Sequence, residues 1–168
     1  PPMQAWLATC HERQFRLGKP GGRRALDLAA ARGERISFQA ACATPVGSEP
    51  AQASCRVSAP AGVKVLVRAV GSVPVPHHNT KTPAEELDGV GLIPGYVPDP
   101  LFPKDTALAA GGEVCAFWIT LDVARTARAG TKKIRVQLEH AAEGKAELAA
   151  TLDVAKIVLA KRKGLTAC

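Results

Sequence analysis

Few side chains in this sequence are grouped as an active site would require. Glu85, Glu86 and Asp88 fall together on one polar segment, but a glycosidase needs two carboxylates set across a sugar ring, and adjacent loop residues do not indicate that separation. The pair His77-His78 could ligate a metal, yet no third ligand follows at a recognisable spacing. We therefore expect solvated carboxylates and hydrogen-bonded loop histidines, with no metal site and no cofactor. The two histidines could still aid a contact with a partner or a sugar.

The cysteines are spaced too widely for a zinc or dithiol motif. No C-x-x-C occurs, so neither a zinc site nor a thioredoxin-like centre is predicted. Gly-rich phosphate loops and the G-x-S-x-G nucleophile motif are missing as well, and no catalytic residue is assigned. Cys42 shares the side-chain parity of Ile36 and Phe38, which predicts a buried thiol. A Cys42–Cys55 disulfide is feasible if the two strands pair, and the cysteines leave the compartment open.

The net charge of +7 could favour nucleic acid, anionic glycans or a membrane surface. The basic residues are scattered, however, and the clusters Arg23-Arg24, Lys132-Lys133 and Lys161-Arg162-Lys163 have no aromatic residues between them as stacking platforms. We expect a solvated surface and no nucleic-acid partner. No apolar run approaches the ~20 residues of a transmembrane helix, and Pro1-Pro2-Met3 is not a secretory leader, so no membrane partner is expected. Because the chain does not begin with Met, we expect a processed or excised piece.

The elements that must position these residues are strands, and the strongest pattern lies in Glu113–Glu139. Apolar residues recur at every second position from Phe117 to Val123 and again from Ile134 to Leu138, with mostly polar residues between. A period of two with one apolar face is typical of a half-buried antiparallel strand. The two strands are joined by the loop 124–130, in which Gly130 tolerates positive φ. A central hairpin is predicted here.

Similar patterns predict an all-β fold for the rest of the chain. About eight or nine short strands separated by turn signals indicate an antiparallel β-sandwich with one long Pro-rich loop. We assign residues 1–160 to this single domain and residues 161–168 to a tail or the start of a linker to a missing domain. The further strands are expected at Met3–Cys10 (with Phe15–Leu17 as a possible extension), Ala25–Ala31, Arg35–Thr44, Ser54–Ser58, Val63–Val73 and Lys145–Leu159.

The stretch from Pro74 to Gly112 breaks the pattern with its many prolines. Because proline fixes φ and removes a ladder donor, no regular sheet is expected to cross this stretch, and a loop of this length usually serves a function or an interface. The prolines lower the entropy cost of presenting Tyr96, Asp99 and Phe102 to a neighbour; a rigid cover over the sandwich edge is the alternative. Trp118 lies on the non-core face of its strand, where it could stack on a sugar or partner or pack under a loop.

Three motifs carry a resemblance to a known family. The segments Gly33–Gln39, Tyr96–Pro103 and Phe117–Val123 resemble the N-terminal β-sandwich domain of glycoside hydrolase family 123 and related uncharacterised glycoside hydrolase-like proteins. The order of the motifs matches, and the likeness spans most of residues 25–155. Two features depart from the family pattern: Val97 separates Tyr96 from Pro98, and the turn at residues 129–133 lacks the usual proline and tyrosine.

The resemblance implies a multidomain parent in which the sandwich precedes a (β/α)8 barrel that hydrolyses N-acetylhexosaminides with an acidic pair. A barrel takes ~200 or more residues, so none fits in this chain. We therefore expect a non-catalytic accessory domain that packs against the barrel through residues 74–112, with Tyr96 and Asp99 at the contact. The alternative is a carbohydrate-binding module that uses Trp118, Tyr96 and His77-His78 directly; a complete enzyme has the least support. A secreted or periplasmic location follows from the resemblance only.

Overall fold

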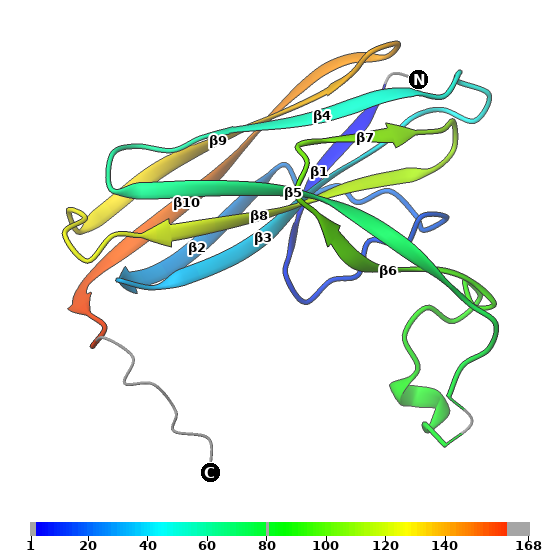
Figure 1. The fold of residues 1–168 in the computed structure, drawn as a ribbon, viewed down its shortest axis with the longest axis horizontal. Helices are drawn as coiled ribbons and strands as arrows, with labels where there is room; N and C mark the ends of the chain where they lie inside the picture. The colour runs from blue at the N-terminus through cyan, green and yellow to red at the C-terminus, as the bar shows by residue number, and fades with distance from the viewer. Residues whose placement is uncertain (1–2, 80, 161–168) are drawn as a thin grey trace.

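The computed structural model describes residues 3–79 and 81–160, and over these ranges the chain folds as a β-sandwich (Figure 1). The predicted all-β sandwich is confirmed, with ten strands in place of eight or nine. The expected tail, 161–168, lies outside the described residues. In the described ranges the one helical element is the 3-10 turn η1 (Ala84–Glu86), and no helix there is long and apolar enough to cross a membrane. The strands are β1 (Gln4–Thr9), β2 (Ala25–Arg32), β3 (Arg35–Ala43), β4 (Ala51–Ser58), β5 (Val63–Val75), β6 (Gly95–Phe102), β7 (Thr106–Ala109), β8 (Val114–Val123), β9 (Gly130–His140) and β10 (Gly144–Val158).

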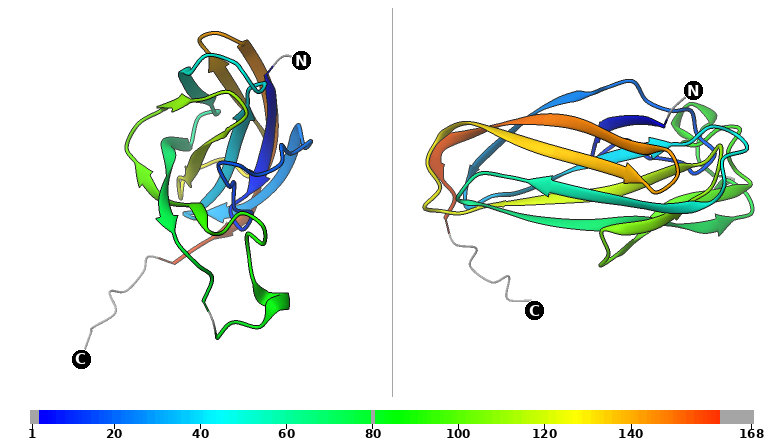
Figure 2. Two further views of the ribbon diagram at one scale, coloured as in Figure 1. Left: turned by 90° about the vertical axis from the view of Figure 1, so that its right-hand side faces the viewer. Right: turned by 90° about the horizontal axis from the view of Figure 1, so that it is seen from above.

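The strands form two five-stranded sheets that face each other (Figure 2). Sheet A has the order β1-β3-β8-β5-β6, and sheet B has the order β2-β10-β9-β4-β7. Strand pairs are antiparallel except β2 with β10, which run parallel with Ala25 beside Ala149. The edge strands are therefore β1 and β6 in sheet A and β2 and β7 in sheet B.

The core lies between the sheets and consists of the side chains on the apolar face of each strand. In sheet A, Phe38 of β3 lies opposite Ile119 of β8, and both are fully buried. Sheet B supplies the facing residues, which are equally closed to solvent: Ile134, Val136, Leu138, Ala150 and Leu152. The parity that the sequence assigned to these strands is the parity that the structure buries.

The strands β8 and β9, adjacent in the chain, do not pair with each other. β8 lies in sheet A between β3 and β5, and β9 lies in sheet B between β10 and β4, so the predicted hairpin is wrong. The connection 124–129 is long enough to cross the ~10 Å between packed sheets, and Ala127 anchors it because this side chain is buried against the core. Each strand still buries one apolar face, which is why the alternation resembles that of a hairpin. Gly130 has the expected positive φ, 110°.

Two strands, β6 and β7, run through the proline-rich stretch 74–112, so the expectation that no sheet crosses it is wrong. Within residues 3–79 and 81–160, β6 pairs only with β5, and β7 pairs only with β4. On such edge strands a proline without an N–H removes no ladder bond, which explains how Pro98 and Pro100 fit in β6. The irregular part is the shorter excursion between Val75 and Gly95, which projects from one end of the sandwich (Figure 1).

The loop between β1 and β2 covers part of the outer face of sheet A. Phe15–Leu17 lies in this loop and does not extend the first strand. Trp6 of β1 donates from Nε1 to Oε1 of Gln14 at 2.9 Å, and a Cβ on Gly21 would lie 2.5 Å from the Trp6 ring. The glycine backbone is therefore packed directly on the indole. The indole is part of a second apolar cluster, formed by Trp6, Ala8, Ala41, Ala43, Val114 and Ala116.

Three cysteines are buried, and they are free thiols in the structure. Cys42 and Cys55 lie on strands of different sheets, β3 and β4, so the pairing that a Cys42–Cys55 bridge required is not formed. Cys42 is instead directly opposite Cys115 on β8. A hydrogen bond between these two thiols, with burial adding, raises the pKa of Cys115, and the same bond lowers the pKa of Cys42. Burial, with smaller effects of Cys42 and Asp105, raises the pKa of Cys55 to about 12.

These environments predict which thiols react in the folded protein. At pH 8 iodoacetamide is expected to modify Cys10, which is half-buried, while Cys42, Cys55 and Cys115 stay unmodified because reagent cannot reach them and two of the three pKa values are raised. Peptide mass spectrometry after alkylation measures each site. The same treatment in denaturant should label all of them, and native labelling of Cys55 would contradict the packing described here.

Candidate functional site

The outer face of sheet A carries a strip of partly exposed apolar side chains around Trp118. Trp118 of β8 lies opposite Arg68 of β5, so Leu66 and Val70, two positions to either side of Arg68, are its diagonal neighbours at ~7–8 Å. Leu101 of the edge strand β6 lies opposite Val70. Leu66 and Leu101 are 41% and 39% exposed, and Trp118 is half-buried. We call Leu66, Val70, Leu101 and Trp118 the apolar strip.

The residues predicted from the proline-rich stretch lie on β6, the edge strand that also carries Leu101. Tyr96 and Phe102 are each 48% exposed, and Asp99 is also exposed. Phe102 rests on the backbone of β5, because a Cβ on Gly71 would lie 2.3 Å from its Cε2 atom and 2.9 Å from Cγ of Pro100. A glycine at position 71 therefore lets β6 present an aromatic ring at the sheet edge.

Gly71 gives a direct test of how β6 is held. Gly71→Ala is expected to displace the Phe102 ring and weaken the β5–β6 contact by about 1–2 kcal/mol, because the new methyl group collides with the ring and with rigid Pro100. Faster hydrogen exchange of the β6 amides, with the core strands unchanged, is the expected measurement. Gly22→Ala is the matched control, since a Cβ there meets nothing within 4 Å.

Tyr96 is fixed from the loop between β1 and β2 by Arg16, a residue that the sequence did not single out. The guanidinium of Arg16 lies 5.3 Å from the centroid of the Tyr96 ring, within the range of a cation–π contact. Arg16 Nε also lies 2.7 Å from Oε2 of Glu113, and this hydrogen bond raises the pKa of the guanidinium. The Arg16 carbonyl accepts from the amide of Val114 at 2.8 Å. Arg16 thus joins the loop between β1 and β2 to both β6 and β8 on the outer face of sheet A.

His77 and His78 follow the end of β5, and Nδ1 of His77 lies 2.9 Å from the carbonyl oxygen of His78. They come three and four residues after Pro74, which pairs with Tyr96. Trp118 is level with Arg68, six residues from Pro74 along β5, so it lies roughly 20 Å from Tyr96 along the strands. The structure therefore separates Trp118 from the other three residues of the predicted sugar site. Among the described residues no group of three side chains could hold a metal ion.

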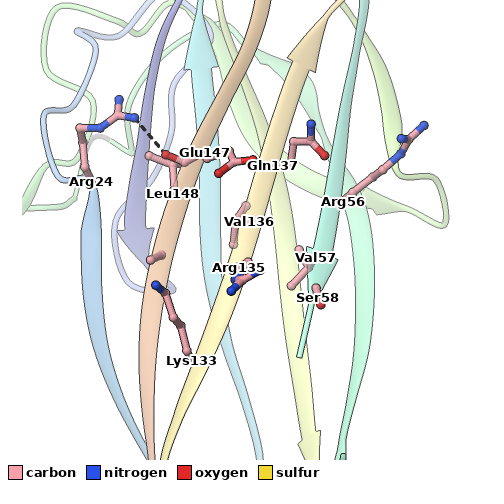
Figure 3. Close-up of a pocket in the computed structure, with 11 residues that line it drawn as sticks. Arg24, Arg56, Val57, Ser58, Lys133, Arg135, Val136, Gln137, Glu147 and Leu148 are labelled. Carbon is pink, nitrogen blue, oxygen red and sulfur yellow. Dashed lines mark hydrogen bonds between the residues drawn. The ribbon is translucent and has the colours of Figure 1, made fainter. Parts of the chain in front are cut away.

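A second feature, on the outer face of sheet B, is a shallow hollow of about 660 Å³. Figure 3 shows Arg24 at the start of β2 on one side and Arg56 of β4 on the other, with Lys133 and Arg135 of β9 between them. Nη2 of Arg24 donates to the carbonyl oxygen of Glu147 at 2.9 Å. We call this the basic hollow; its other lining residues include Ser58, Gln137 and Ala149.

The sequence could not reveal the basic hollow. Lys133 and Arg135 are recognisable as the polar face of a strand, but Arg24 and Arg56 come from segments far away in the chain. The hollow forms because β10 separates β2 from β9 and presents small Ala149 opposite Arg135. Only the strand order of sheet B brings the four cations to one face.

The comparisons with known proteins support the architecture. A scan against protein-family models gives no match, and a search of curated proteins gives none either. Among solved structures, a family 123 glycoside hydrolase from Clostridium perfringens is similar with a TM-score of 0.67 and 12% identity, covering 93% of this chain and 28% of that chain. The likeness shows the fold. The chain thus spans little more than a quarter of the length of that enzyme.

Two other solved structures are less similar. A FixG-related protein from Vibrio parahaemolyticus has a TM-score of 0.48 at 10% identity and covers 92% of this chain and 97% of that chain. The cupredoxin domain of amoB from Nitrosocaldus yellowstonii has a TM-score of 0.41 at 13% identity and covers 79% of this chain and 63% of that chain.

Proposed function

We propose that this chain is a non-catalytic accessory β-sandwich domain of a glycoside hydrolase-like protein. In this role it packs against a catalytic (β/α)8 barrel of the same parent chain through the outer face of sheet A and the β6 edge. The analogy rests on the family 123 glycoside hydrolase from Clostridium perfringens, whose structural analysis concerns glycolipid glycan hydrolysis. The fold of the present chain is similar to one part of that enzyme. Fold likeness does not establish function, so the local surface has to carry the proposal.

The observation that carries it is the apolar strip. Contiguous apolar groups at a protein surface mark interaction sites, and further along the edge strand β6 the side chains of Tyr96 and Asp99 are also exposed. Aromatic residues inside a polar rim are the composition of a stable domain contact. The Arg16–Tyr96 contact and the prolines of β6 hold this edge in one conformation, which lowers the entropy cost of docking.

The coding sequence beyond Cys168 provides the first test. We expect the reading frame to continue with roughly 200 or more residues of alternating strand and helix, as a (β/α)8 barrel requires, and to carry the acidic pair of the enzyme. A stop codon soon after Cys168 would overturn the accessory role.

Catalysis is tested separately on the chain itself. The 168 residues are expected to give no turnover of an aryl N-acetylhexosaminide, because no catalytic carboxylate pair is assigned to them. Release of the aryl group above the rate of a buffer control would show an enzyme complete in itself and contradict the proposal.

Direct glycan binding by the sandwich is the second candidate, and the observation that favours it is the half-buried indole of Trp118 beside Arg68. An aromatic ring next to a hydrogen-bond donor suits a sugar ring. Under this alternative the isolated domain binds a neutral oligosaccharide, and Trp118→Ala abolishes the binding. If the isolated domain binds no glycan at this face, the glycan-binding alternative is excluded.

A further inference from the structure

The basic hollow contains positive charge that the protein itself does not neutralise. Among residues 3–79 and 81–160 the salt bridges involve Arg13, Arg16, Arg23, Arg35 and Lys145, and none of the four cations of the hollow takes part. Glu147 is the one carboxylate that lines it, and its backbone carbonyl is what holds Arg24. A local excess of cations on a concave surface attracts an anion.

We propose that the basic hollow binds an acidic glycan whose sugars carry carboxylate groups. This surface is on the opposite sheet from the docking face proposed above and does not depend on that role. Three of the four cations are arginines, and the planar guanidinium matches a carboxylate with two parallel hydrogen bonds. Ser58 and Gln137 supply neutral groups between the charges for sugar hydroxyls.

The spacing of the cations fits an extended ligand with several charges. Arg56 lies opposite Gln137, and Arg135 lies opposite Ser58, so the two arginines are diagonal neighbours at ~7–8 Å. Lys133 precedes Arg135 by two positions on the same strand, ~7 Å away. Arg24 lies two strands from Arg135, at ~10 Å, with Ala149 between them. Because the four cations come from three segments of sheet B, an extended polyanion can contact all of them.

Two other classes of anionic partner fit the hollow less well. No aromatic side chain lines it, and single-stranded nucleic acid is usually held by stacking on aromatic rings. A peptide that binds as an added strand needs free backbone groups, but at Arg135 and Gln137 the backbone of β9 is paired on both sides, with β10 and with β4. Recognition here has to use side chains alone, which suits a glycan.

The test titrates the protein with a fluorescently labelled oligogalacturonate and follows polarisation at low and moderate salt. Binding that weakens as salt rises is expected, and the double variant Arg56→Glu/Arg135→Glu should weaken it about tenfold or more. Both side chains are exposed, so the fold should be unaffected. If the double variant is nevertheless unstable, Arg56→Ala and Arg135→Ala replace it, each with a smaller expected loss.

A matched control separates the hollow from the overall charge of the protein. Lys64→Glu/Lys81→Glu changes the net charge by the same amount at exposed positions outside the hollow, and its affinity is expected to stay within about threefold. Equal weakening by both double variants would show attraction to the net charge and overturn the proposal. Absence of binding at low salt would overturn it too. Tighter binding of a single-stranded oligonucleotide or a sulfated oligosaccharide of equal charge would overturn the assignment to a carboxylate glycan.

Discussion

Replacing Phe117 with alanine is expected to destabilise the domain by about 3–5 kcal/mol, the range for a fully buried phenylalanine. The Phe117 ring is closed to solvent, and its strand, β8, is the central strand of sheet A between β3 and β5. Removing the ring leaves a cavity whose walls are strands held on both sides, so the site cannot collapse to refill it. The midpoint of urea unfolding gives the measurement.

Phe102→Ala is the matched control, since it removes the same ring from an edge strand where the ring is 48% exposed. Its expected cost is below about 1.5 kcal/mol, because less area is withdrawn from water. Should Phe117→Ala fail to fold, Phe117→Leu keeps most of the volume and is expected to cost ~1–2 kcal/mol. Equal costs at positions 102 and 117 would contradict the assignment of the core.

Replacing Trp118 with alanine is expected to weaken docking of the sandwich on its barrel by about 30-fold, or ~2 kcal/mol. Trp118 is at the centre of the apolar strip, flanked by Leu66 and Val70, and central aromatic residues carry most of the energy of an interface. Titration calorimetry of the two domains prepared separately measures the change. Leu101→Asp should have a comparable effect, because it places a charge on the same surface.

Leu108→Ala is the control for this experiment. Leu108 is 75% exposed on β7, in sheet B. The substitution therefore removes an exposed apolar side chain and leaves the apolar strip unchanged. The affinity of the Leu108→Ala variant for the barrel is expected to be unchanged. If Trp118→Ala and Leu108→Ala bind equally well while both keep their thermal midpoints, the outer face of sheet A is not the docking surface.

The sequence predicted eight of the ten strands and their faces, because burial of one face imposes alternation along each strand. Phe38 and Cys42, assigned to one parity, are buried in the core. Tyr96 and Phe102, predicted to lie in a loop, are exposed on the edge strand β6. These are local properties of a strand. The resemblance to family 123 sandwiches agrees with the fold likeness that the structure shows.

The sequence did not predict which strands pair. Alternation gives the same pattern whether Ile119 and Ile134 belong to one sheet or face each other from two, so the β8–β9 crossing was read as a hairpin. Proline hid β6, since its effect on a ladder depends on whether the strand is at an edge. Arg16 and the basic hollow were missed for the same reason: their partners are set by the strand order, which no single segment encodes.

The position of β10 in the middle of sheet B has a consequence for how the chain folds during synthesis. All strands of sheet A lie within residues 4–123, whereas β2 is attached to the rest of sheet B only through β10, the last strand to be made. The inner face of sheet A therefore has no complete partner until the ribosome has released Val158. Folding that waits for such distant pairings is slow, in the range of milliseconds to seconds. The nascent chain thus exposes Phe38 and Phe117 from their synthesis until β10 has been made, a period in which a chaperone that binds apolar strands would protect it from aggregation.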